Sequence, residues 1–105
     1  MTFPLTTTVV NLRNEPHDVY IGRGKDGEIP DPPERGCFGN PFSVRRYGRR
    51  GAIDRFVVYF YDRVEEDKAF REAVLALQGK RLGCFCKPDE CHGDVMKQWL
   101  DEQAS

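Results

Sequence analysis

Residues 82–95 read LGCFCKPDECHGDV, and the remainder of the chain is arranged around this segment. It contains three of the four cysteines and one of the two histidines. Residues 80–86 are apolar in alternation and are bounded by a glycine and a proline, a pattern that predicts a short strand. The period of two places Cys84 and Cys86 on one face of that strand.

A helix is predicted directly after this strand, over residues 89–103. Asp89 follows a proline and is a suitable N-cap, and the apolar residues behind it recur at helical spacing. This start places Cys91 and His92 in the first helical turn. Free backbone N–H groups and the positive end of the helix dipole favour an anion or a thiolate at that position.

Two further strands are predicted near the N-terminus, over residues 6–13 and 19–21. The short turn between them favours an antiparallel hairpin, because a parallel pair needs a long crossover. Residues 25–42 contain many glycines and prolines and few apolar residues, so they are predicted to form a long loop. Loops of that length in compact domains are usually functional or mobile.

Two helices are predicted between that loop and the strand 80–86. Apolar residues at i, i+3, i+4, i+7, i+8 and i+11 predict a helix over 52–64 whose aromatic side chains belong to the core. A second helix is capped by Asp67 and stops at Gly79. The element order β-β-loop-α-α-β-α predicts an α/β fold, a small sandwich of helices on a three-stranded mixed sheet, with residues 1–105 as a single domain.

The charge of the chain limits its partners. Sixteen Lys and Arg residues against 17 Asp and Glu residues give a net charge of −1, which argues against a protein that coats nucleic acid. Five arginines nevertheless lie close together around Tyr47. These arginines are Arg45, Arg46, Arg49, Arg50 and Arg55. They form either ordinary solvated surface, a basic rim around an anion site or a local contact to nucleic acid.

No apolar run is long enough to cross a membrane, and the start of the chain does not resemble a signal peptide. We therefore expect a cytoplasmic protein of a bacterial or infected host cell that makes no membrane contact. Its thiols are then reduced. Closely spaced cysteines in such a compartment are more often catalytic or metal-binding than disulfide-bonded.

A zinc site is one interpretation of the cysteine cluster. Cys84, Cys86, Cys91 and His92 form the pattern C-x-C-x4-C-H, which offers four ligands that zinc accepts. The spacing fits poorly, because structural zinc sites usually present C-x2-4-C knuckles and adjacent helical residues point about 100° apart. Cys37 is a possible substitute ligand.

A reactive thiol is the other interpretation. Thiols in the first turn of a helix commonly have a lowered pKa, and the imidazole of His92 is a suitable base beside Cys91. Cys86 lies at the end of the predicted strand, and ligands of open α/β sheets bind beyond the carboxyl ends of strands. Cys86 and Cys91 are therefore candidates for a nucleophile or redox thiol, whereas Cys84 is expected to be packed in the core.

Two glycine-rich motifs are candidate ligand contacts. A strand that runs into Gly22-Arg23-Gly24 lets the backbone approach a ligand and offers N–H groups and a guanidinium to a phosphate. The same motif makes an ordinary turn, and it lacks the third glycine and the helix of a dinucleotide fingerprint. In GNPF, residues 39–42, the proline holds Asn40 extended, and its amide is suited to a base or sugar edge.

Together, VYIGR at 19–23, GNPF at 39–42 and CFCKPDECHGDV at 84–95 resemble a family of short phage and bacterial proteins catalogued as a domain of unknown function. The resemblance spans roughly positions 8–100 and implies the fold and a phage or bacterial origin, but no reaction. Cys37 departs from the family pattern. The positions that the resemblance picks out are Gly22, Arg23, Gly39, Asn40, Pro41, Cys84, Cys86, Cys91, His92, Gly93 and Asp94.

These observations predict one pocket for a phosphate-bearing nucleotide or nucleoside derivative, bound without a cofactor. The predicted ligand contacts are Gly22, Arg23, Gly24, Gly39, Asn40 and Gly93, and the predicted catalytic residues are Cys91, His92, Cys86 and Asp94. The reaction class is transfer or hydrolysis at a glycosidic or phosphate bond, with a cysteine as nucleophile and His92 as general acid/base. The alternative is a non-enzymatic accessory protein that binds a host protein, with a structural cysteine–histidine cluster around zinc.

Overall fold

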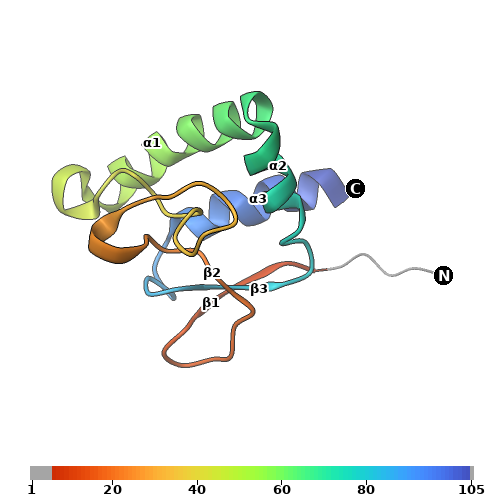
Figure 1. The fold of residues 1–105 in the computed structure, drawn as a ribbon. Helices are drawn as coiled ribbons and strands as arrows, with labels where there is room; N and C mark the ends of the chain where they lie inside the picture. Colours follow the sequence, from red (N-terminus) through yellow and green to blue (C-terminus); the bar gives the residue numbers. More distant parts are fainter. Residues whose placement is uncertain (1–5, 105) are drawn as a thin grey trace.

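The computed structural model describes residues 6–104, which form an α/β fold with three strands and three α-helices (Figure 1). This confirms the predicted fold class and element order. The elements are β1 (Thr8–Asn11), β2 (Val19–Tyr20), the 3-10 turn η1 (Lys25–Gly27), α1 (Val44–Glu66), α2 (Lys68–Leu75), β3 (Arg81–Cys84) and α3 (His92–Ala104). None of the helices in residues 6–104 is long and apolar enough to cross a membrane.

The sheet has the order β1-β3-β2, and both outer strands run parallel to β3. The predicted antiparallel hairpin, and with it the mixed sheet, is wrong. Val9 and Val19 both pair with Leu82, from opposite sides. The strand β1 is only four residues long and spans about 13 Å, whereas the connection 12–18 can reach up to about 24 Å. The chain can therefore return to the start of a parallel strand without a helix in the connection.

The connection 12–18 crosses the face of the sheet that the helices leave uncovered (Figure 1). Gly83, in the central strand, makes room for this crossing, because a Cβ atom there would lie 2.7 Å from the ring of His17. Asp18 anchors the end of the connection, where its carboxylate accepts the backbone N–H of Arg81 at 2.7 Å and two guanidinium N–H groups. These bonds from Arg81 lower the pKa of Asp18 to about 2.

Helix α1 begins at Val44, eight residues before the predicted start at 52. Ser43 caps it by accepting the backbone N–H of Arg46 at 3.1 Å. The backbone is kinked at Gly48, where φ is 72°. The segment before the apolar repeat is rich in arginine and glycine, so hydrophobic periodicity does not reveal its helical part. Most of the predicted stripe is buried, but Val57 at the predicted position i+4 is exposed and Tyr61 is only partly buried. The buried residues are Ala52, Ile53, Phe56, Phe60 and Val64.

The other element boundaries differ from the predicted ones at their ends. Asp67 caps α2 as predicted, accepting the N–H of Phe70 at 3.0 Å, but the helix ends at Leu75. Helix α3 begins at His92, so Asp89 is not its N-cap, and β3 ends at Cys84 instead of residue 86. The strands β1 and β2 are likewise shorter than predicted. Side-chain patterns extend past the last paired residue, and the backbone hydrogen bonds decide where an element ends.

The core lies between the sheet and the three helices. Phe60 of α1 is fully buried, and its ring centroid lies 5.9 Å from that of Phe70 in α2 and 6.0 Å from that of Trp99 in α3. The ring of Phe56 stacks on Phe60 at 5.4 Å. One aromatic cluster therefore joins all three helices, and it holds the first half of α1 beside the carboxyl ends of β2 and β3.

Candidate functional site

A cavity of about 290 Å³ lies beyond the carboxyl ends of β2 and β3. Four separate segments form its wall: the residues after β2, the loop before α1, the first turns of α1 and the connection from β3 to α3. The lining residues are Gly22, Arg23, Asn40, Phe42, Ser43, Val44, Arg49, Ala52, Ile53, Cys86, Glu90, Cys91 and His92. This is the position at which open α/β sheets commonly bind ligands.

The structure brings together six of the residues that the sequence picks out as site candidates. Gly22, Arg23, Asn40, Cys86, Cys91 and His92 all line the cavity. Gly24, Gly39, Gly93, Asp94 and Cys84 do not line it. A Cβ atom at Gly24, Gly39 or Gly93 would meet neighbouring atoms at 3.1, 2.9 or 2.7 Å, so these three glycines allow segments to pack closely.

Arg49 and Glu90 are cavity residues that sequence reasoning did not single out as ligand contacts. The sequence places Arg49 within a cluster of five arginines and does not distinguish it from the others, because the apolar repeat of the helix starts only at Ala52. The sequence predicts Glu90 in the first turn of the helix over residues 89–103. The sequence signal for Arg49 is a basic residue one helical turn before an apolar stripe. This signal is not specific for a ligand contact.

Asn40 uses its side chain within the protein. Its Oδ1 accepts the N–H of Phe42 at 2.9 Å, and its Nδ2 donates to the carbonyl of Ala52 at 3.2 Å. The carbonyl of Asn40 accepts a hydrogen bond from Nε of Arg23 at 2.7 Å. This residue therefore connects the loop before α1 to both α1 and the segment after β2, and its backbone orients the Arg23 guanidinium.

Arg23 and Arg49 bring positive charge to the cavity wall. None of the ion pairs in residues 6–104 involves Arg23. Arg49 donates to the carbonyl of Glu90 at 3.0 Å and lies 3.8 Å from the carboxylate of Asp89. A hydrogen bond to the Cys86 sulfur raises the pKa of Arg49, so this guanidinium and that thiol are in contact. Arg49 thus holds the segment after β3 against α1.

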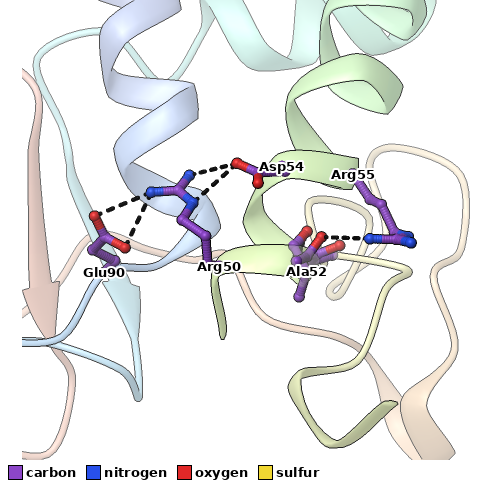
Figure 2. A network of polar contacts seen from close by, with 7 residues as sticks. Arg50, Ala52, Asp54, Arg55 and Glu90 are labelled. Carbon is purple, nitrogen blue, oxygen red and sulfur yellow. Dashed lines mark hydrogen bonds and ion pairs between the residues drawn. The ribbon is translucent and has the colours of Figure 1, made fainter. Parts of the chain in front are cut away.

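The carboxylate of Glu90 is paired at the rim of the cavity (Figure 2). Arg50 donates from Nη1 to both of its oxygens at 3.2 Å. The same guanidinium pairs with Asp54, with Nη2 at 2.8 Å from Oδ1. These groups are exposed, so each pair contributes only about 0–1 kcal/mol to stability. The pairing nevertheless offsets the negative charge of Glu90 beside the two cavity arginines.

Cys84 and Cys91 are buried neighbours whose sulfur atoms lie 3.4 Å apart. The hydrogen bond between the two thiols, together with backbone N–H groups of Lys87 and Cys86, lowers the pKa of Cys84, against the effect of burial. The same hydrogen bond and burial raise the pKa of Cys91. Cys84 is packed in the core, as predicted, but its sulfur also faces a second thiol. Cys86 is only half-buried and is the more accessible cavity thiol.

The four residues of the zinc interpretation do not converge on one point. Within residues 6–104, no three His, Cys, Asp or Glu side chains lie together as a set that could hold a metal ion. Cys86 faces Arg49, and His92 is bonded to the backbone. Cys37 is buried in the hydrophobic core, and burial raises its pKa.

Asp94 supports the start of α3 and does not face the cavity. One carboxylate oxygen accepts the backbone N–H of Cys91 at 3.2 Å, and the other pairs with the ammonium of Lys87. The N–H of Asp94 in turn donates to the Cys91 carbonyl at 3.0 Å. This reciprocal capping holds the connection from β3 and the first turn of α3 in one geometry. This geometry favours a role for Asp94 in positioning the connection from β3 and the first turn of α3.

His92 is buried at the first position of α3. Its Nε2 lies 2.7 Å from the carbonyl oxygen of Ile21, and because that oxygen only accepts, Nε2 carries the proton and donates it. The ring meets that of Phe56 edge-on at 5.0 Å. Burial lowers the pKa of His92, although the carbonyl groups of Ile21 and Phe38 oppose this effect. The geometry favours His92 as a tie between α3, α1 and the end of β2.

The lowered pKa of His92 predicts that the protein loses stability in mild acid. Below about pH 6.5 the unfolded chain protonates this residue while the folded chain does not, so the stability that is complete above that pH falls as the pH decreases. The slope contributed by one such group is at most about 1.4 kcal/mol per pH unit. Urea unfolding of the wild type and of His92→Gln at several pH values measures it, and we expect His92→Gln to flatten the profile.

His17→Gln is the matched control for this measurement, since His17 is the other histidine of the chain and lies on the opposite face of the sheet. It should keep the slope of the wild type. An unchanged slope in a folded His92→Gln protein would contradict the burial of a neutral imidazole at this position.

Comparison with known proteins identifies relatives without an assigned activity. The chain is 33% identical over 88 residues to the "Uncharacterized 12.4 kDa protein in nrdA-td intergenic region" of Enterobacteria phage T4, an alignment that covers 84% of this chain and 71% of the phage protein. No solved structure is significantly similar to the present chain. The family model described as "Domain of unknown function (DUF4326)" matches residues 7–102. The resemblance to an uncharacterised family with phage members is thereby confirmed, and the chain belongs to the DUF4326 family.

Proposed function

We propose that the cavity binds a small phosphate-bearing ligand of the nucleotide or nucleoside type. Arg23 and Arg49 take the phosphate, and the backbone around Gly22 contacts the sugar. The observation that carries this proposal is that two arginines from separate segments line one cavity whose lining carboxylate, Glu90, is already paired with Arg50. Guanidinium groups bind phosphate oxygens through two parallel hydrogen bonds.

The size of the cavity supports a small ligand. Its volume of about 290 Å³ lies just below the range of about 300–1,000 Å³ for small-molecule sites. Ala52 and Ile53 of α1 are apolar lining residues, as are Phe42 and Val44. A nucleoside monophosphate or a phosphorylated pentose matches this combination of apolar lining residues and two cations.

Cys86 is the thiol best placed to act on such a ligand. It lies in the cavity wall, is half-buried and contacts the guanidinium of Arg49. In a transferase or hydrolase reaction, the Cys86 sulfur would form a bond to the anomeric carbon or the phosphorus while the leaving group departs, and an acceptor or water would then displace the sulfur. Cys91 fits this role less well, because burial and Cys84 raise its pKa.

Ligand titration tests the binding step. We expect adenosine 5′-monophosphate to raise the melting temperature of the wild type and adenosine alone to raise it less, because the phosphate meets the two arginines. Arg49→Ala should weaken the affinity by about tenfold or more, which corresponds to one lost charge-assisted hydrogen bond. Isothermal titration at fixed salt measures the change. Inorganic phosphate is the minimal probe if the base is not adenine.

Arg45→Ala is the control, since Arg45 is an exposed arginine of the first turn of α1 that does not line the cavity. It should bind like the wild type at the same salt concentration. Equal weakening by Arg45→Ala and Arg49→Ala, or no response to any phosphorylated compound, would contradict the proposal. Cys86→Ser should keep the binding and remove any turnover. Binding without turnover in the wild type would indicate the non-enzymatic alternative.

A further inference from the structure

We infer that Cys84 and Cys91 form a dithiol site that a small hydroperoxide oxidises, reversibly, to an intramolecular disulfide. This chemistry differs from the proposed ligand binding and does not depend on it. The two sulfur atoms already lie 3.4 Å apart, and a disulfide bond is about 2.05 Å long. The sulfurs therefore need to approach by only about 1.4 Å to reach bonding distance.

The backbone on both sides of the pair is held in place. Cys84 is the last residue of the central strand, and its carbonyl accepts the N–H of Leu12 at 3.0 Å. Cys91 directly precedes α3, and its N–H and carbonyl are both bonded to Asp94. Both thiols are 2% exposed. The short separation thus results from packing of the strand against the helix start, and the two thiols are fixed as a pair.

The surroundings of Cys84 favour its thiolate. The Cys91 sulfur lies within hydrogen-bond distance of this sulfur, and backbone N–H groups of Lys87 and Cys86 and the Lys87 ammonium also lie near it. The lowered pKa of Cys84 agrees with this arrangement. The thiolate is the form that attacks a peroxide, and the pair places a second thiol directly beside the sulfur that would react first. Cys91 also lines the cavity, so the pair lies directly behind the cavity wall.

The oxidation balances in two steps. The Cys84 thiolate attacks one oxygen of the hydroperoxide, an S–O bond forms, the O–O bond breaks, and the leaving oxygen takes up a proton. The sulfur of Cys91 then attacks Cys84, an S–S bond forms, the S–O bond breaks, and hydroxide leaves with the Cys91 proton as water. Two thiols lose two electrons in total, and hydrogen peroxide becomes two waters. A dithiol reductant reverses the change by thiol–disulfide exchange.

Peptide mapping of the folded, reduced protein after exposure to hydrogen peroxide tests this site. We expect one intramolecular disulfide that links Cys84 to Cys91 and that dithiothreitol removes. Cys37→Ser is the matched control, because Cys37 is also a buried thiol but lies elsewhere in the core, and this variant should form the same disulfide. Cys91→Ser should instead give a sulfenic acid on Cys84 that a dimedone probe traps.

A second readout covers the case in which a serine variant is poorly folded. Oxidised wild-type protein should unfold at a higher urea concentration than reduced wild-type protein, because a disulfide that matches the native geometry restricts the unfolded chain. The inference is overturned if the main product links Cys86 or Cys37, or joins two molecules. It is equally overturned if Cys84 and Cys91 remain reduced while Cys86 is oxidised, or if the disulfide lowers the midpoint of unfolding.

Discussion

Phe60→Ala is expected to lower the free energy of unfolding by about 3–5 kcal/mol. Phe60 has no exposed surface, and its ring contacts aromatic rings of α1, α2 and α3. Truncation removes the transfer free energy of the ring and leaves a cavity between three helices, which cannot collapse without moving all of them. Small domains have about 5–15 kcal/mol of total stability, so this change removes a large share of it.

Urea unfolding followed by circular dichroism measures this loss as a shift of the midpoint. Val58→Ala is the control, since Val58 lies on the same helix but its side chain is 64% exposed. It should change the stability by no more than about 0.5 kcal/mol. A loss of less than about 1 kcal/mol in Phe60→Ala would contradict the placement of this ring at the junction of the helices.

Gly36→Ala is the second change for which we expect a large effect, a loss of about 2–5 kcal/mol. The backbone of Gly36 has a φ of +104°, a conformation that residues with a side chain rarely adopt. An added Cβ atom would also lie 2.3 Å from the backbone nitrogen of Gly24. The free-energy costs of the backbone strain and of the steric overlap therefore add. Because Gly24 follows Arg23, relief of the overlap would displace a cavity arginine, and the affinity for phosphate should fall as well.

Gly48→Ala separates these two causes. Gly48 has a φ of +72°, but an added Cβ atom would meet nothing within 4 Å. With ψ at 166°, Gly48 lies in a region that almost only glycine adopts, so this variant should show only the strain, about 1–3 kcal/mol. Thermal and urea unfolding of the two alanine variants give the comparison. Equal losses would show that the close contact between Gly36 and Gly24 adds nothing to the effect.

The cavity explains why some of the candidate site could be predicted from sequence. The motifs VYIGR, GNPF and CxC…CH are polar and rich in glycine, and they follow predicted strands or precede a predicted helix. Such positions lie at the edge of a sheet, where chain segments meet. Arg23, Asn40 and Cys86 are brought together accordingly. The hydrogen bonds of two of these residues differ from the roles that the sequence predicts. The side chain of Asn40 is hydrogen-bonded to Phe42 and Ala52, and the ring of His92 is hydrogen-bonded to Ile21.

Local patterns determined which segments became helices and strands, and which helix faces were buried. The apolar stripe of α1 and the cap at Asp67 follow from spacing and from side-chain hydrogen bonding within a few residues, so one sequence is enough to predict them. The α/β class follows from the order of these elements.

Only the tertiary structure decided the order and direction of the strands in the sheet, which charged residues line the cavity, and the neighbour of each thiol. β1 and β2 are separated by β3, which comes more than sixty residues after β2 in sequence, and no local pattern encodes that insertion. Arg49 reaches Cys86, and Cys84 reaches Cys91, because the core sets the distance between β3, α1 and α3. Periodicity assigns a residue to a face of its own element, whereas contacts between elements depend on how their faces pack together.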